Sequence, residues 1–175
     1  LHLAVRAGSE PLIKILLAAR ATLELRDERQ QTAIHVAAAM NRSAAMRLLL
    51  ADRKQILRPQ VSFGLTSRFP RSTRGRKDGS SGSLLDATDE ERRTPLHLAA
   101  VSGPSTLKLL VESGAPLDAL DKDGRSALMI LSEAGQAELV QELLDAGASI
   151  GLVDKDEDTA YSLAASEGHS DVLRA

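Results

Sequence analysis

The stretch Thr94-Pro95-Leu96-His97-Leu98-Ala99-Ala100 predicts the start of a short, closely packed helix. Thr94 suits the residue before the helix, because its hydroxyl oxygen can accept from a free backbone N–H of the first turn. Pro95 suits the first helical position, where its missing N–H costs no hydrogen bond. The leucines and the alanine pair give this helix an apolar side that another helix can approach closely.

The same heptapeptide pattern recurs along the chain. Copies begin at Thr32, Ser126 and Thr159, and the chain opens inside a further copy at Leu1. The position held by His97 falls at residues 2, 35, 97, 129 and 162, so the steps are 33, 62, 32 and 33 residues. A period near 33 residues built on this pattern is typical of ankyrin repeats. The chain resembles that family over its whole length except for one insertion.

This resemblance implies an all-α ankyrin-repeat solenoid of stacked helix-turn-helix units with short β-hairpin-like turns. We expect ankyrin repeats one (partial) and two in residues 1–54, an insertion in 55–83, and repeats three, four and five (the last partial) in 84–175. The second helix of repeat two is expected to end near Asp52, with Arg53 where the family prefers glycine. Because both ends of the chain fall inside a repeat, we expect it to be part of a longer protein.

The composition argues against several classes of function. The chain has no cysteine, which removes disulfides, thiolate metal sites and cysteine nucleophiles. Aromatic residues make up only 2% of it, too few for a platform on which bases stack. The net charge of −2 gives the whole chain no affinity for polyanions. No run of 18 or more apolar residues is present. We therefore expect no transmembrane segment and a cytoplasmic or nuclear location.

The insertion 55–83 differs from the repeats in charge and pattern. It holds six basic residues and one acidic residue, a net charge of +5, which leaves −7 for the rest of the chain. It has no sustained helical or strand period, so we predict a disordered segment. Its part Arg68–Lys77 could bind nucleic acid or an anionic membrane, or act as a nuclear-import patch. Ser72 and Thr73 are possible phosphorylation sites. An insertion without function is the alternative, because long loops cost little closure entropy.

Three histidines recur with the repeat, namely His2, His35 and His97. Stacked repeats would place them about 10 Å apart, whereas the nitrogen ligands of one zinc ion lie about 2.0–2.1 Å from it. The family resemblance implies that each ring instead bonds the threonine at the turn. No nucleophile elbow and no P-loop accompanies them. We therefore predict no catalytic residue, no metal site and no cofactor.

Four aspartates recur at the expected turns, namely Asp27, Asp89, Asp121 and Asp154. Acidic clusters around them, such as residues 154–158, resemble calcium ligands only loosely, because the spacing of an EF-hand loop is missing. The aspartate side chain often bonds the backbone of the residues that follow it in a turn. We predict that these four aspartates brace their turns.

The resemblance implies a non-catalytic scaffold that binds a partner protein on the concave side of the solenoid. Carried over by position, the candidate partner-binding residues lie at the turn tips and on the inner helices: Arg6, Glu28, Arg29, Gln31, Met40, Glu90, Glu91, Arg93, Val101, Lys122, Asp123, Arg125, Glu133, Lys155, Asp156 and Asp158. This surface becomes more acidic toward the C-terminus, which favours a basic or polar epitope. We expect a monomer. An alternative is a regulatory or targeting domain of a larger enzyme whose catalytic part lies outside this chain.

Overall fold

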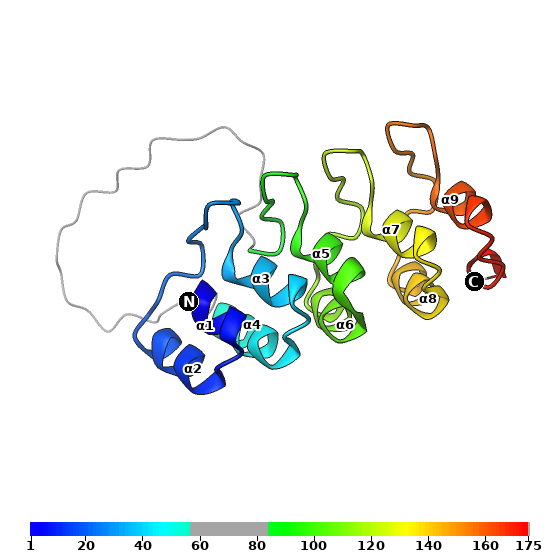
Figure 1. Ribbon diagram of the computed structural model, residues 1–175. Coiled ribbons are helices and arrows are strands. Elements are labelled where there is room, and N and C mark those ends of the chain that lie inside the picture. The colour runs from blue at the N-terminus through cyan, green and yellow to red at the C-terminus, as the bar shows by residue number, and fades with distance from the viewer. Residues whose placement is uncertain (57–83, 175) are drawn as a thin grey trace.

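The computed structural model describes residues 1–56 and 84–174, which form a row of helix pairs (Figure 1). The inner helix of each pair is α1 (His2–Ala7), α3 (Ala33–Ala39), α5 (Pro95–Ser102), α7 (Ala127–Glu133) or α9 (Ala160–Ser166). The outer helix is α2 (Glu10–Ala18), α4 (Ser43–Ile56), α6 (Pro104–Glu112) or α8 (Ala137–Asp145), and the last pair ends in the single 3-10 turn η1 (Val172–Arg174). The described residues contain helices and turns but no strand, so the predicted all-α ankyrin solenoid is confirmed.

The heptapeptide begins the inner helices as its sequence predicts. Thr94 has an extended backbone and precedes α5, whose first residue is Pro95. In α7 the hydroxyl oxygen of Ser126 accepts from the backbone N–H of Met129 over 3.3 Å. These caps satisfy donors that the first helical turn leaves free.

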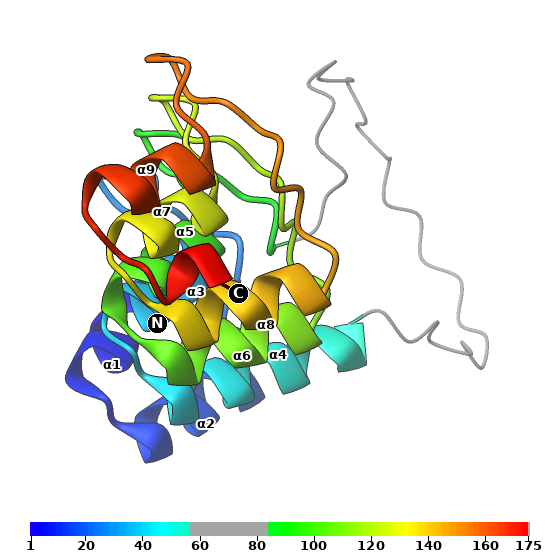
Figure 2. The same cartoon turned by 90° about the vertical axis from the view of Figure 1, so that its right-hand side faces the viewer.

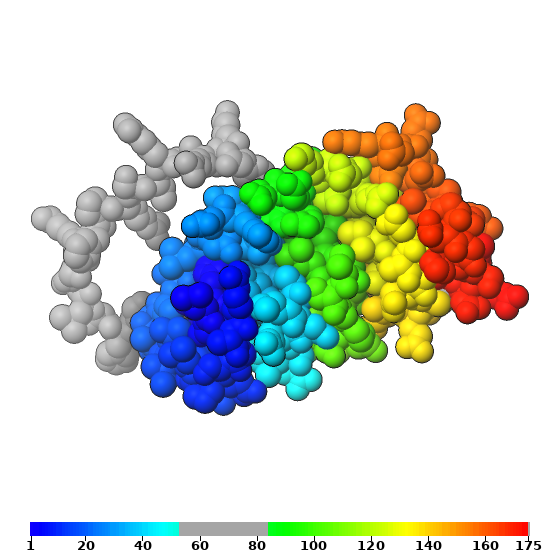
Figure 3. All heavy atoms as spheres, in the orientation of Figure 1, coloured from blue at the N-terminus to red at the C-terminus, as the bar shows by residue number. Residues whose placement is uncertain are grey.

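The core runs along the whole row and is built from the repeated apolar positions. Ile34, Leu96 and Leu128 occupy the same place in successive inner helices, and each has at most 1% of its surface exposed. Fully burying one such side chain stabilises the fold by about 1.5–3 kcal/mol. Small residues beside them, such as Ala37 and Ala99, let neighbouring inner helices pack closely. The space-filling view shows each repeat in contact with the next (Figure 3).

Residues with left-handed backbone follow the ends of several helices. Gly8 has a φ of 70° and Asn41 a φ of 48°. Arg20, which stands where the family prefers glycine, also takes a positive φ of 58°. A side chain in this conformation costs on the order of 1 kcal/mol relative to glycine, a cost that packing of the repeat outweighs here.

The expected end of the second helix in repeat two was wrong. Helix α4 continues to Ile56, so Arg53 lies inside it and not in a left-handed turn. A glycine favours a stop here, as Gly114 and Gly147 show by taking positive φ just beyond α6 and α8, but Arg53 stays helical, unlike Arg20 at the same repeat position. Residues 57–83, with Ser72, Thr73 and Arg68–Lys77, lie outside the described residues.

The row is continuous across that segment. Helices α3 and α5 pack against each other, as do α4 and α6, although residues 57–83 separate them in sequence. Seen along the row, the turns between pairs project together beside the inner helices (Figure 2). We call the surface formed by these turn tips and the exposed sides of the inner helices the inner face.

Candidate protein-binding surface

The turns that border the inner face share one hydrogen-bond pattern. In the turn of repeat three, Oδ1 of Asp89 accepts from the backbone N–H of Glu91 at 3.0 Å and of Arg93 at 2.9 Å. Asp27, Asp121 and Asp154 make the same two bonds in their turns, at 2.8–3.0 Å. The predicted bracing role of the four aspartates is therefore confirmed, and one oxygen of each carboxylate is already used.

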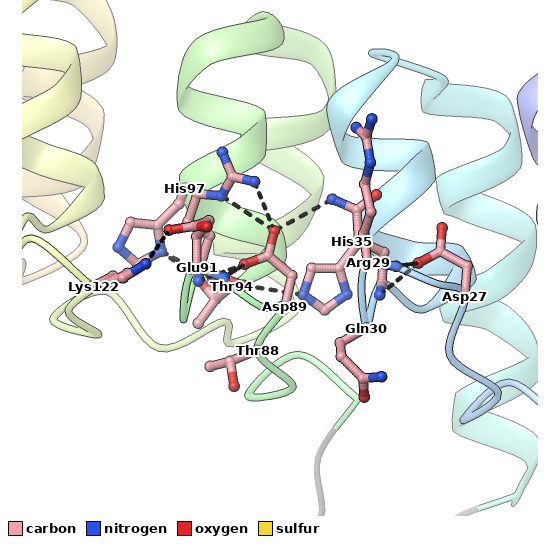
Figure 4. Close-up of polar contacts among 12 residues, drawn as sticks. Asp27, Arg29, Gln30, His35, Thr88, Asp89, Glu91, Thr94, His97 and Lys122 are labelled. Carbon is pink, nitrogen blue, oxygen red and sulfur yellow. Dashed lines mark hydrogen bonds and ion pairs between the residues drawn. The ribbon is translucent and has the colours of Figure 1, made fainter.

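The tips of neighbouring turns are joined through the backbone. The N–H of Glu90 donates to the carbonyl of Arg29 at 3.2 Å, and that of Lys122 to the carbonyl of Glu91 at 2.8 Å. The N–H of Lys155 donates to the carbonyl of Asp123 at 3.0 Å. Nζ of Lys122 also lies 3.3 Å from a carboxylate oxygen of Glu91 (Figure 4). The tips thus form one connected edge, with opposite charges at each joint.

Buried histidines on α3 and α5 tie these two inner helices to the next turn. Nε2 of His35 donates to the carbonyl of Arg93 at 3.2 Å, and Nε2 of His97 donates to that of Arg125 at 3.0 Å. Because Nε2 carries the proton, Nδ1 of His97 is left to accept from the backbone N–H of Thr94, 3.2 Å away. The predicted structural role is confirmed, and Figure 4 shows these rings pointing along the row.

The surroundings of these histidines favour the neutral ring. Burial lowers the pKa of His35 and of His97 below the ordinary 6.5, and the carbonyl bonds and nearby carboxylates only partly oppose this effect of burial.

The outer histidines make similar contacts: Nε2 of His2 lies 2.8 Å from the carbonyl of Gln31, and that of His169 lies 3.0 Å from the carbonyl of Glu133. In residues 1–56 and 84–174, no three His, Asp or Glu side chains are grouped as metal ligands would be.

Asp89 is the centre of a buried polar network. Its side chain is fully buried, and Oδ2 accepts from Gln31 Nε2 at 3.3 Å and from Arg93 Nε and Nη2 at 3.1 and 2.9 Å. Burial by itself disfavours the charged carboxylate. The bonds from Arg93 and Gln31 outweigh burial and hold the pKa of Asp89 below its usual value.

Repeat four holds a second network, centred on Arg125. Its Nη1 lies 2.7 Å from Oε2 of Glu133 on α7, and its Nε lies 3.5 Å from Oδ2 of Asp154 in the next turn. The arginine therefore lies between a turn and an inner helix and joins two repeats.

The predicted partner-binding residues divide by exposure. Those exposed on the inner face are Arg6, Glu28, Arg29, Met40, Glu90, Val101, Lys122, Asp123, Lys155 and Asp156. Those half-buried are Glu91, Arg93, Arg125, Glu133 and Asp158, while Gln31 is buried. Gln31 and Arg125 thus join neighbouring repeats through Asp89 and Asp154, whereas Arg93 pairs with Asp89 within its own turn. Their position in the repeat showed that they lie near the tips, but no local pattern showed which carboxylate each one pairs with.

The most exposed apolar side chains on the inner helices are Leu3 and Val101, with 77% and 74% of their surfaces accessible. Tyr161 on α9 follows with 59%, and Met40, just after α3, with 43%. Leu3 was not among the predicted residues, and Glu157, exposed beside Asp156, was also missed. The equivalent positions Val36, Leu98 and Leu163 are buried, so the repeat pattern gave no signal that Leu3 would be exposed.

No helix in the described part of the chain has the length and apolar character needed to cross a membrane.

Comparison with known proteins agrees with this geometry. The model of the family "Ankyrin repeats (3 copies)" matches residues 1–67, 74–154 and 96–175. The B-cell lymphoma 3 protein homolog of Mus musculus is 31% identical over 121 residues, which cover 69% of this chain and 21% of that protein. Ankyrin repeat domain-containing protein 63 of Homo sapiens is 32% identical over 102 residues, 55% of this chain and 27% of that protein. The Transient receptor potential cation channel subfamily A member 1 homolog of Caenorhabditis elegans is 26% identical over the whole of this chain, which covers 15% of that protein. The chain thus spans about a quarter or less of these relatives, and it belongs to the ankyrin repeat family.

Proposed function

We propose that this chain is a non-catalytic module that binds a partner protein on its inner face. Ankyrin repeats generally serve protein–protein interaction, and the inner face is the surface to which we assign that interaction in this chain. The supporting observation is that the side chains fall into two groups, one engaged within the fold and one exposed. The histidines and turn aspartates that resemble catalytic or metal-binding groups are engaged between and within repeats, whereas Met40, Val101 and several charged tips are exposed together on one face.

The test is affinity capture with the purified chain, read by mass spectrometry. A variant combining Asp123→Lys, Asp156→Lys and Asp158→Lys is expected to lose its partners, because it reverses charge on the inner face. The matched control combines Glu10→Lys, Glu112→Lys and Glu138→Lys, three charge reversals at exposed sites on outer helices α2, α6 and α8. An unchanged partner list for the triple variant would contradict the proposal.

A second candidate is a regulatory or targeting domain of a larger protein, including an enzyme. It is supported by the small share of each relative that the chain covers, such as 15% of the Caenorhabditis elegans channel homolog. The full-length reading frame separates this candidate from an independent scaffold. Association with nucleic acid or anionic membrane through Arg68–Lys77 is tested by deleting residues 57–83. Retention on heparin that survives the deletion would exclude that segment as the cause.

A further inference from the structure

The inner face carries an apolar patch that the fold does not require. It consists of Ala39 and Met40 at the end of α3, Val101 near the end of α5, and Ala134 just after α7, all exposed. The hydroxyl of Ser102 donates to the carbonyl of Ala39 at 2.8 Å, which shows how closely α3 and α5 pack here. At the position of Val101, the other repeats carry Arg6, Ala39, Glu133 and Ser166, so a polar side chain fits equally well.

The same face has an acidic end. Residues 154–174 hold six acidic and two basic side chains, whereas residues 1–26 hold two acidic and four basic ones. Asp156, Glu157 and Glu167 are exposed, and within the described ranges none of these three carboxylates lies in an ion pair. In repeat four the acidic side chain near the end of the inner helix, Glu133, is paired with Arg125 of the same repeat. Repeat five has Asp158 at the position of Arg125, so it supplies no arginine of its own.

The backbone of the turn tips is unsuited to binding an added strand. The N–H groups of Glu90, Lys122 and Lys155 donate to the preceding turns, and the floor of the face consists of helix sides. An extended partner would therefore bury backbone groups without hydrogen bonds, which is costly, whereas a helix satisfies its own. Recognition through side chains alone favours a helical partner segment.

We infer, on the basis of the proposed function, that the inner face binds an amphipathic helix of a partner protein with apolar side chains at one end and arginine or lysine at the other. The apolar end lies on Met40 and Val101, and the basic end lies against Asp156, Glu157 and Glu167. The charge complementarity follows from the acidic end and from the net charge of −7 outside the segment 57–83.

The repeat spacing predicts the length of that helix. Packed helices lie about 8–10 Å apart, so α9 lies roughly 16–20 Å from α5, two steps along the row. At about 1.5 Å per residue, this distance corresponds to about 11–13 residues of helix between the apolar and the basic ends. Figure 1 shows α5, α7 and α9 in this order.

The probe is a fluorescent synthetic helix of about 20 residues, with leucines in its first turns and arginines in its last turns. A matched peptide has the same composition with the arginines moved next to the leucines. We expect the first peptide to bind at least about tenfold more tightly in fluorescence anisotropy, a difference of about 1.4 kcal/mol. Equal binding of the two peptides, or no binding of either, overturns the inference.

Variants of the chain locate the binding. Two variants are expected to weaken the binding of the first peptide about tenfold: Val101→Glu, and the double variant Asp156→Lys with Glu157→Lys. A peptide with glutamate in place of arginine is expected to bind the double variant more tightly than the original chain. Ile15→Glu on α2 and Glu138→Lys on α8, both exposed on outer helices, are the controls and should leave binding unchanged. Circular dichroism checks that each variant is folded. Equal effects of inner and outer variants would contradict the inference. Cellular capture that depends on the inner face, without peptide binding, would leave the proposed function standing and reject only the helix.

Discussion

The side-chain amide of Gln31 donates to the buried carboxylate of Asp89 over 3.3 Å, although the two residues are 58 positions apart in sequence. The contact joins repeat two to repeat three across the segment 57–83. Nε2 of His35 and the carbonyl of Arg93 make a second polar contact at the same junction. Burial of a carboxylate is tolerated here because two side chains and two backbone N–H groups all donate to it.

Asp89→Ala is therefore expected to lower the free energy of unfolding by about 2–3 kcal/mol, since it leaves buried backbone donors without an acceptor. Chemical denaturation followed by circular dichroism measures this loss. The matched control is Asp27→Ala, which removes the same two turn bonds. Asp27 is half-buried, and its turn is the first of the four aspartate turns in the described residues. We expect a loss of about 1 kcal/mol there. Equal losses for the two variants would show that the network around Asp89 adds no stability.

Acidification is expected to destabilise the chain through His35 and His97. Their pKa values are lowered by burial, so the unfolded chain binds protons more readily than the folded one once the pH falls below about 6.5. The free energy of unfolding should therefore be largest above pH 6.5 and decrease as the pH falls from 7.5 to 5.5. Asp89 does not contribute in this range. Its pKa is lowered from the ordinary 3.8, so the stability that its carboxylate provides is lost only at pH values below that range.

The measurement is a series of denaturation curves across that pH range. His97→Gln is expected to reduce the pH dependence, because glutamine retains a donor and an acceptor but does not titrate. A variant as sensitive to pH as the original chain would exclude His97 as a source of the effect.

The contrast between Arg93 and Arg125 shows what could be predicted from sequence. Both hold the fifth position of a turn, but Arg93 folds back onto Asp89 while Arg125 reaches Glu133 and the next turn. The reason lies on the inner helix, where repeat three offers Val101 at the place of Glu133. Helices, caps and turn aspartates were predictable because they depend on residues close in sequence. These side-chain partners depend on how two repeats face each other.

The end of α4 shows a different limit. The expected stop at Asp52 relied on a family position, and Arg53 stands there in place of glycine. Arg53 stays helical and α4 continues to Ile56, whereas Arg20 at the same repeat position takes a positive φ, so the residue type at this position does not by itself fix the end of the helix. The period predicted the existence of the helix but not its length.

Gly135→Ala is expected to destabilise repeat five. Gly135 has a φ of 68°, and an added Cβ would lie 2.7 Å from the ring of His169, which is too close. We expect a loss of more than about 1 kcal/mol, together with faster hydrogen exchange in α9. Gly147→Ala is the control: its φ is 95°, but nothing lies within 4 Å of the added Cβ, so only backbone strain remains. If both variants lose the same stability, the contact between Gly135 and His169 is not tight.

Replacing residues 57–83 by a short glycine-serine linker is expected to leave the solenoid folded. Contacts between described residues already join repeats two and three, including those of Gln31 with Asp89 and of Asn41 with Thr106. Shortening a connection also lowers the entropic cost of closing it, by about 0.6 kcal/mol for each halving of its length. The deletion should therefore have unchanged helical circular dichroism and an equal or slightly higher free energy of unfolding. Adding Gln31→Ala to the deletion should then cost the same as it does in the full chain, because the junction is the same in both. A deletion that loses helix, or one in which Gln31→Ala has no effect, would mean that the junction depends on the removed segment.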